Sequence, residues 1–398
     1  MFPGRVTETE MTLMLMNPKM GLATLSTPSL VLDKAVLAAN AERMTSHLKD
    51  QAIRFRPHMK TAKSIDVARM AIAGNFGGVI VSTIREAEYF ADHGISDITY
   101  GVSVLPDKLP RIAALVRRGV KVGVILDQCA VAEQISREAV RFGITLDVLI
   151  ELDSGERRSG VTADSAELIE IGHVLERLPG TRLQGVLTHA GQSYQCRTIA
   201  DIERIAEQER LSVVTAAERL RAAGLRVDVV SVGSTPTVTH GTNFEGLTEV
   251  RCGVYMFGDM MQSQIYSCSR DDIALSVLAT VIGHRPALNM ALIDAGALAL
   301  SKDRSTGAPG LAEDIGYGLV MDMHCERRIG DVKVGHVYQE HGMLVSSGPF
   351  PFDALPVGSR IRILPNHACL TAAMYDGYNV VSGADDSGIE FWPRVNGW

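Results

Sequence analysis

The sequence alternates short apolar runs, rich in β-branched residues, with longer amphipathic segments from about residue 29 to residue 258. Apolar runs joined by helices are typical of parallel strands that are buried on both faces. The runs are 29–33, 53–60, 77–83, 98–102, 121–127, 147–153, 182–189, 227–234 and 249–258, and helical spacing is found in segments such as 35–48, 107–118, 130–142 and 202–223. We leave the first run, 29–33, out of the count because it comes before the first helix. About eight strand–helix units then remain. This number favours a closed α/β barrel of the (β/α)8 TIM type over an open doubly wound sheet.

The pattern changes at about residue 273. The later runs are short, are separated by Gly, Pro and Asp turns, and have no amphipathic helices between them; they are 275–284, 290–294, 330–339, 342–345, 360–364 and 377–381. Such a pattern is typical of a mostly antiparallel β domain. We therefore predict a barrel of residues 26–265 and a β domain made of residues 1–25 and 266–398.

Composition excludes several classes of function. The chain has 398 residues and a formal net charge of −7, without a long basic run, so we expect no nucleic-acid partner. No apolar stretch approaches the roughly 20 residues that cross a bilayer, and the N-terminus lacks the features of a signal peptide. We expect no membrane partner and a cytoplasmic location.

Lys60 ends the apolar run 53–60. Functional residues of a parallel barrel gather where the strands end, and a partly desolvated lysine there is a good nucleophile toward an aldehyde. A lysine taken alone would more often be a solvated surface residue. Arg56 and His58 precede it with the spacing of one strand face, so all three side chains should point the same way. This constellation favours a cofactor anchor.

Polar residues also follow the later strands. Gly233, Ser234 and Thr235 form a turn that could bind phosphate through backbone amides and hydroxyls, although such turns are common. His189 could stack on a cofactor ring or move protons, or be a structural histidine. Arg158 and Arg251 offer fixed positive charge that could face a ring nitrogen.

The second domain contains His367-Ala368-Cys369. On an extended segment, a histidine and a cysteine two residues apart point the same way and could share a zinc ion. A chance pairing is the alternative. Two protein ligands would leave positions open for water and substrate, as a catalytic metal needs.

Together these residues resemble the fold-type III pyridoxal-phosphate (PLP) enzymes, specifically the D-serine dehydratase and D-threonine aldolase group, whose barrel is related to that of alanine racemase. The resemblance runs from residue 27 to residue 398. It is carried by the segments 56–61, 158–160, 188–191, 231–237, 251–255, 339–342 and 365–369. Aldolases of this group tend to carry His-x-Asp where dehydratases carry His-x-Cys, so the chain is most similar to the dehydratases of the D-threo-3-hydroxyaspartate type.

The resemblance implies a role for each site residue. Lys60 would hold PLP as a Schiff base with His58 beside it, and His367 and Cys369 would bind a divalent metal, Zn, Mn or Mg. The other cofactor contacts that it implies are Arg158, His189 and Tyr194 around the ring and Gly233, Ser234, Thr235, Gly253 and Tyr255 around the phosphate. It also implies a homodimer whose active site takes residues from both subunits.

The implied activity is the dehydration of a D-3-hydroxy amino acid to a 2-oxo acid and ammonia. Lys60 would remove the Cα proton, and the metal at His367 and Cys369 would assist loss of the 3-hydroxyl. One alternative is an aldolase that splits the same substrates into glycine and an aldehyde. Another is a non-catalytic PLP carrier, which would have no need for the His367 and Cys369 pair.

Overall fold

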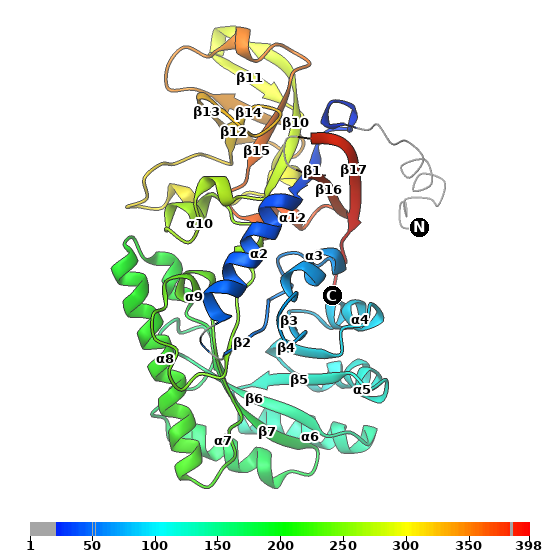
Figure 1. Ribbon diagram of the computed structural model, residues 1–398, viewed down its shortest axis with the longest axis vertical. Helices are drawn as coiled ribbons and strands as arrows, with labels where there is room; N and C mark the ends of the chain where they lie inside the picture. The colour runs from blue at the N-terminus through cyan, green and yellow to red at the C-terminus, as the bar shows by residue number, and fades with distance from the viewer. Residues whose placement is uncertain (1–20, 50, 52, 383–384) are drawn as a thin grey trace. The chain divides into compact units, whose positions relative to one another are not determined.

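The computed structural model describes residues 21–49, 51, 53–382 and 385–398, and its chain forms two compact units (Figure 1). Of the described residues, one unit contains 38–272, 309–312 and 394–398, and the other contains 21–37, 273–308 and 313–393. The start of the barrel differs from the predicted boundary at residue 26 because the strand β1 (Ser29–Asp33) pairs in the second unit. Residues 1–20, which we assigned to the β domain, lie outside the described residues.

The first unit is built on eight parallel strands in the order β2-β9-β8-β7-β6-β5-β4-β3. Their bounds are β2 (Arg54–Phe55), β3 (Val79–Val81), β4 (Asp97–Ser103), β5 (Lys121–Leu126), β6 (Leu146–Leu152), β7 (Thr181–Thr188), β8 (Val229–Val232) and β9 (Glu249–Val250). All seven residues of β6 are buried, as expected for a strand that is covered on both faces.

Hydrogen bonds around His58 close the ring of strands. His58 forms a parallel bridge with Ile80 of β3, and Met59 N donates to Ile80 O over 2.8 Å. On the other side His58 N donates to Cys252 O, also over 2.8 Å. The segment after β2 therefore joins β9 to β3, and the predicted barrel is confirmed.

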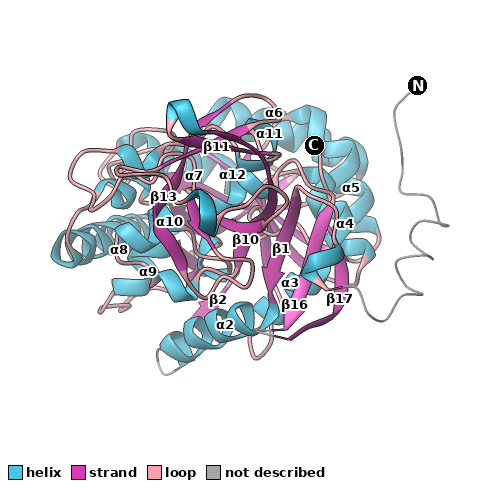
Figure 2. Ribbon diagram, turned by 90° about the horizontal axis from the view of Figure 1, so that it is seen from above, coloured by secondary structure: helices cyan, strands magenta, loops and turns pink. Residues whose placement is uncertain are grey.

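The helices of this unit lie outside the strands (Figure 2). They are α3 (Ile65–Ala71), α4 (Ile84–Asp92), α5 (Leu109–Arg117), α6 (Cys129–Phe142), α7 (Ala166–Arg177), α8 (Ile199–Ala222), α9 (Thr235–His240) and α10 (Met260–Gln264); α2 (Lys34–Lys49) follows β1. Inside the barrel, Ile125, Leu149 and Leu187 form a buried apolar cluster against which Val229 packs. None of the helices in the described part of the chain has the length and hydropathy needed to span a bilayer.

The second unit is a mostly antiparallel β domain, as predicted. Its strands are β10 (Leu275–Arg285), β11 (Met290–Ile293), β12 (Leu319–Met321), β13 (Arg328–Val337), β14 (Gly342–Val345), β15 (Arg360–Leu364), β16 (Gly377–Ser382) and β17 (Asp385–Pro393), together with β1; the short helices are α11 (Ala297–Leu300) and α12 (Ala368–Ala372). The order β10-β11-β14-β13-β12-β15 returns to β10, so these six strands close on themselves.

Three strands of this unit extend the sheet beyond the closed ring. β1 pairs antiparallel with β10 and parallel with β16, which in turn pairs antiparallel with β17. The prediction missed β12, which has only three residues, and β17, which begins with the polar sequence Asp-Asp-Ser-Gly. The three residues of β12 are all apolar, but the run is too short to show a period, and the apolar residues of β17 begin only at Ile389.

Candidate active site

Four neighbouring strands of the barrel carry most of the predicted site. β2, β9, β8 and β7 are consecutive in the sheet order, and the carboxyl ends of parallel strands meet at one rim. The predicted residues that follow these strands are Lys60 and His58, Gly253 and Tyr255, Gly233, Ser234 and Thr235, and His189 and Tyr194. The fold therefore collects on one rim residues that lie far apart in the sequence.

Lys60 lies in a turn after β2. The regular part of the predicted strand 53–60 is Arg54–Phe55, and Arg56 N and His58 N continue the hydrogen bonds to the β9 side at 2.9 and 2.8 Å. Lys60 is exposed in this chain. Its backbone N–H donates to His58 Nδ1 over 3.3 Å. An exposed amine at the rim is accessible to an aldehyde ligand.

His58 is a neutral side chain beside this lysine. Burial lowers the pKa of His58 well below its ordinary value, and the nearby Lys60, Arg251 and His189 lower it further. Its Nε2 atom lies 3.5 Å from Ser82 Oγ. These mutual effects indicate that the four groups share one region of the rim.

His189 follows β7 and is fixed by the next strand end. Its Nδ1 lies 2.7 Å from the carbonyl oxygen of Gly233, which can only accept, so the proton is on Nδ1 and Nε2 is an acceptor. Burial and the charge of Lys60 lower the pKa of His189 to about 3, although the bond to Gly233 acts in the opposite direction. The imidazole is therefore uncharged near neutral pH. Its ring centroid lies 6.2 Å from that of Tyr194.

The predicted phosphate turn begins at Gly233. This residue has φ +151°, and a Cβ there would lie 1.7 Å from the carbonyl oxygen of Arg251, so only glycine fits. Ser234 Oγ accepts from Thr237 N at 3.3 Å and shares a hydrogen bond of 2.9 Å with Ser193 Oγ. The turn is thus held by the start of α9 and by the loop after β7.

Two buried hydroxyls at this rim make no hydrogen bond within the described residues, those of Thr235 and Tyr255. An unpaired buried hydroxyl costs about 1–3 kcal/mol and requires an explanation. The Thr235 hydroxyl has the Cys252 thiol nearby, which is a weak partner. Burial raises the pKa of Tyr255 well above its ordinary value, so its hydroxyl stays a donor. Two such donors beside the Gly233 turn fit a phosphate group, and with Lys60 on the same rim they fit PLP.

Gly253 allows the strand ends to approach each other. A Cβ at this position would lie 2.7 Å from the carbonyl oxygen of His58 and 3.0 Å from Thr61 Oγ1. The segment after β9 could therefore not lie this close to the segment that carries Lys60 if residue 253 had a side chain.

The two arginines considered for the ring nitrogen differ in how they are held. Arg158 is 55% exposed and pairs with Glu156 at 3.4 Å, yet it is near enough to affect His189. Arg251 is buried, and its Nε donates to Ser231 Oγ over 2.8 Å while Nη2 donates to Thr188 O. The fold fixes Arg251 much more firmly than Arg158, and the ring contact of either stays a prediction.

Glu209 is a site residue that the sequence analysis missed. It is 1% exposed, and its Oε1 accepts hydrogen bonds from Ala190 N at 2.9 Å and Gly233 N at 3.0 Å. Burial raises the pKa of Glu209, while hydrogen bonds from Thr237 and these amides act against the rise. A signal was present in the sequence: Glu209 lies on the buried stripe of α8 with Ile202, Ile205, Val213 and Ala216.

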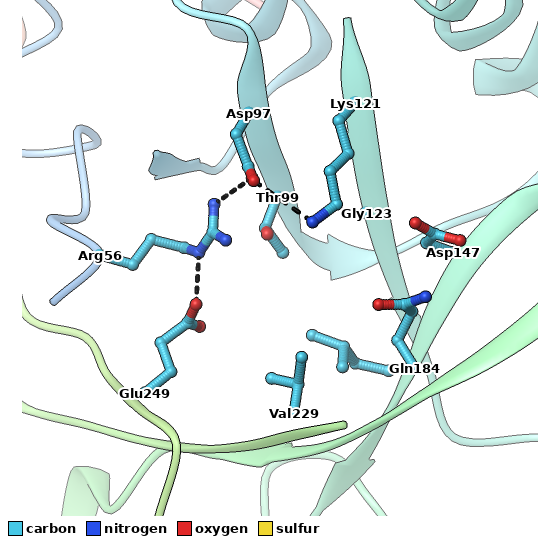
Figure 3. Close-up of a pocket in the computed structure, with 10 residues that line it drawn as sticks. Arg56, Asp97, Thr99, Lys121, Gly123, Asp147, Gln184, Val229 and Glu249 are labelled. Atoms are coloured by element: carbon cyan, nitrogen blue, oxygen red, sulfur yellow. Dashed lines mark hydrogen bonds and ion pairs between the residues drawn. The ribbon is translucent and has the colours of Figure 1, made fainter. Parts of the chain in front are cut away.

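Arg56 does not join Lys60, so the prediction that the two share a strand face is wrong. The backbone pairs with the β9 side as far as His58, but Lys60 lies in the turn that follows, whereas Arg56 points into a pocket inside the barrel (Figure 3). There it pairs with Asp97 at 2.7 Å and with Glu249 at 2.8 Å. Asp97 begins β4, which puts this pocket toward the amino ends of the strands.

The predicted metal pair lies in the β domain, at the start of α12. β15 ends at Leu364, and Cys369 is in the first turn of α12, so the two residues do not share an extended segment as predicted. His367 Nδ1 lies 3.7 Å from Asp303 Oδ2. Burial would raise the pKa of Asp303, but hydrogen bonds from His367 and Ser305 hold it at about 2.

The donor set of this pair is compatible with a metal. Imidazole nitrogen and thiolate sulfur are ligands of zinc, and the imidazole of His367 has a carboxylate partner of the kind that orients metal-binding histidines. Among the described residues, no three His, Cys, Asp or Glu side chains are grouped to hold a metal ion. Any ion at His367 and Cys369 would thus have only two ligands from this set.

Two protein-family models match the chain. Residues 32–261 match the alanine racemase N-terminal domain, and residues 274–381 match the putative serine dehydratase domain. The chain belongs to the alanine racemase N-terminal domain family. Its barrel is therefore of the alanine racemase type, the fold of PLP-dependent enzymes, and its β domain is of the serine dehydratase type.

Several members of the family are similar over nearly their whole length. D-threo-3-hydroxyaspartate dehydratase of Delftia sp. (strain HT23) is 44% identical over 95% of this chain and 99% of its own. D-serine dehydratase of Dictyostelium discoideum is 30% identical over 93% and 97%. D-threonine aldolase of Arthrobacter sp. is 29% identical over 90% of each chain. These relatives are lyases.

Solved structures agree with this assignment. The structure of the Delftia enzyme has a TM-score of 0.91 at 42% identity and covers 95% of this chain and all of its own. D-threonine aldolase from Filomicrobium marinum has a TM-score of 0.80 at 27% identity and covers 94% and 96%. Alanine racemase of Clostridium difficile, at 15% identity and a TM-score of 0.66, shares the fold.

Proposed function

We propose that this chain is a PLP-dependent dehydratase of D-3-hydroxy amino acids, of the D-threo-3-hydroxyaspartate type, which releases a 2-oxo acid and ammonia. The observation that carries this proposal is the 44% identity to D-threo-3-hydroxyaspartate dehydratase over 99% of that enzyme. The D-serine dehydratases of the family support the reaction class at lower identity.

The rim residues support the cofactor assignment. PLP held by Lys60 would supply an electron sink for the bond that breaks at Cα. The amine of Lys60 would accept the Cα proton. The neutral His189 has its proton on Nδ1, directed at the Gly233 carbonyl, and would offer Nε2 as an acceptor. Tyr255, Thr235 and the Gly233 turn would hold the phosphate.

We further propose that His367 and Cys369 hold a divalent metal. Such an ion would supply Lewis-acid assistance to loss of the substrate hydroxyl. Solved structures of D-threo-3-hydroxyaspartate dehydratase support this proposal. They include a histidine-to-alanine variant and a metal-free form of a cysteine-to-alanine variant. The two changed residues are two positions apart, as His367 and Cys369 are in this chain. We propose a homodimer on the basis of the family resemblance.

Product analysis tests the reaction. The protein is incubated with D-threo-3-hydroxyaspartate, D-serine and D-threonine, with added Zn²⁺, Mn²⁺ or Mg²⁺, and ammonia, 2-oxo acid and glycine are measured. We expect ammonia and 2-oxo acid in equal amounts. Glycine with an equal amount of aldehyde as the main product would replace this proposal with the aldolase reaction, which the D-threonine aldolases of the family make the second candidate.

A lysine variant tests the cofactor anchor. We expect Lys60→Ala to lose the visible absorption band of the bound cofactor, and Lys108→Ala to keep it. Lys108 is the control because its amine is already paired with the adjacent Asp107, at 2.6 Å. A band retained in Lys60→Ala would refute the anchor, and absence of turnover with all three substrates in a protein that carries the band would favour a PLP carrier.

A further inference from the structure

A chain of alternating charges crosses the interior of the barrel. From Lys121, the contacts pass through Asp97 and Arg56 to Glu249, at 3.3, 2.7 and 2.8 Å (Figure 3). From Glu249 Oε1, a hydrogen bond of 2.9 Å leads to Ser231 Oγ. Ser231 Oγ in turn accepts from Arg251 Nε over 2.8 Å. The chain thus begins among the amino ends of the strands and finishes at the rim that carries Lys60.

The strand geometry explains this path. Glu249 and Arg251 are two residues apart along β9 and its extension, so their side chains point to the same side. Ser231 of β8 is the register partner of Glu249. The hydroxyl of Ser231 therefore lies between the carboxylate and the guanidinium, donating to the first and accepting from the second.

Burying these charged groups costs free energy of desolvation. The side chains of Arg56 and Glu249 are 6% and 2% exposed, and buried ion pairs seldom stabilise a protein more than apolar residues of the same size would. Branched apolar residues usually fill the interior of such barrels. A charged layer at this depth therefore points to a role other than stability.

Arg251 is the member of this series of charged residues that lies at the site. Its guanidinium is held by Ser231 and by the carbonyl of Thr188, the residue before His189. Its charge helps to keep both His58 and His189 neutral. Any group that sets the position of Arg251 also sets the electrostatic field around Lys60.

We propose that Glu249 is a positioning residue: through Ser231 its carboxylate fixes the guanidinium of Arg251 at the cofactor rim, and the Arg56–Asp97 pair holds that carboxylate in place. This inference rests on the proposed cofactor role of Lys60, but not on the choice of substrate. The Asp97 end lies in the pocket of Figure 3, so residues distant from the rim act on Arg251 through a series of ion pairs and hydrogen bonds.

The test uses the cofactor-loaded enzyme with Glu249→Gln, which keeps the shape but loses the charge, and Ser231→Ala, which removes only the bridge. We expect both to shift the pH midpoint of the cofactor absorption by about half a pH unit or more. We also expect kcat to fall about tenfold with KM unchanged within about twofold.

Asp147→Asn is the matched control. Asp147 is buried, lines the same pocket and pairs with Arg182 Nε at 2.9 Å. Among the described residues it makes no hydrogen bond to the series of charged residues that leads to Arg251. We expect it to lower the melting temperature without moving the absorption midpoint.

Three outcomes decide between the alternatives. An unchanged midpoint in folded Glu249→Gln, or the same shift in Asp147→Asn, would overturn the inference; if Glu249→Gln does not fold, Ser231→Ala decides in the same way. The midpoint is measured without substrate. If the protein proves not to be a dehydratase, the inference about Glu249 is therefore unaffected. A wild-type protein with no Lys60-dependent band would refute the proposed cofactor role and this inference with it.

Discussion

His189 donates a hydrogen bond from Nδ1 to the carbonyl oxygen of Gly233 over 2.7 Å, which joins the ends of β7 and β8. The same carbonyl belongs to the residue whose amide is held by Glu209 at 3.0 Å. His189, which we propose to contact the cofactor ring, and the Gly233 turn, which we propose to bind its phosphate, are therefore parts of one hydrogen-bonded unit.

The pKa of about 3 for His189 predicts a stability change with pH. Between pH 6.5, the ordinary pKa of about that value in the unfolded chain, and pH 3, the unfolded chain binds a proton at this histidine that the folded protein does not bind. Stability is therefore complete above pH 6.5 and is lost as pH falls, by at most about 1.4 kcal/mol per pH unit for this group. Chemical unfolding at several pH values should show a shallower dependence in His189→Gln. An identical slope in both proteins would contradict the assignment.

Removal of the Glu209 carboxylate should loosen two loops at once. In Glu209→Ala the amides of Ala190 and Gly233 lose their buried acceptor, and we expect a loss of about 2–4 kcal/mol in unfolding free energy. We expect PLP affinity to fall as well, because the Gly233 turn loses support. Glu209→Gln keeps an acceptor oxygen and is the control; its stability should lie close to that of the wild type, and an equal loss in both variants would argue against this role.

Tyr255→Phe should separate cofactor binding from folding. The Tyr255 hydroxyl is buried and unpaired within the described residues, so its removal should leave the stability of the cofactor-free protein unchanged or raise it by up to about 1 kcal/mol. The dissociation constant for PLP should rise about tenfold, because a phosphate donor is lost. Equilibrium dialysis and thermal unfolding measure the two effects. Unchanged PLP affinity would remove Tyr255 from the phosphate site, and Tyr100→Phe provides a comparison at a buried tyrosine of β4.

Asp303→Asn should weaken metal binding without touching the metal ligands. Asp303 Oδ2 lies 3.7 Å from His367 Nδ1, and partners of this kind orient a ligating histidine and raise its basicity. We expect metal affinity to fall about tenfold, measured by competition with a chromophoric chelator. His367→Ala should lose more affinity than Asp303→Asn; the reverse order, or no effect of either change, would contradict the metal assignment.

Local sequence determined the architecture because periodicity is a property of neighbouring residues. The run 121–127 and the strand β5 (Lys121–Leu126) nearly coincide, as do the run 360–364 and β15 (Arg360–Leu364). Polar residues placed after such runs were sufficient to predict Lys60, His189 and Gly233 at one rim. Of the missed strands, β12 is apolar but only three residues long, and β17 begins with four residues that are not apolar.

The sequence by itself therefore determined the two kinds of sheet, the family resemblance and the rim where the chemistry would lie. Only the tertiary structure decided which neighbours each side chain meets. It took β1 into the β domain, turned Arg56 away from Lys60 toward Asp97 and Glu249, and placed Glu209 under the Gly233 turn. The physical reason is that backbone periodicity is set within a few residues, whereas ion pairs and buried hydrogen bonds form between strands that the chain brings together only when the barrel closes.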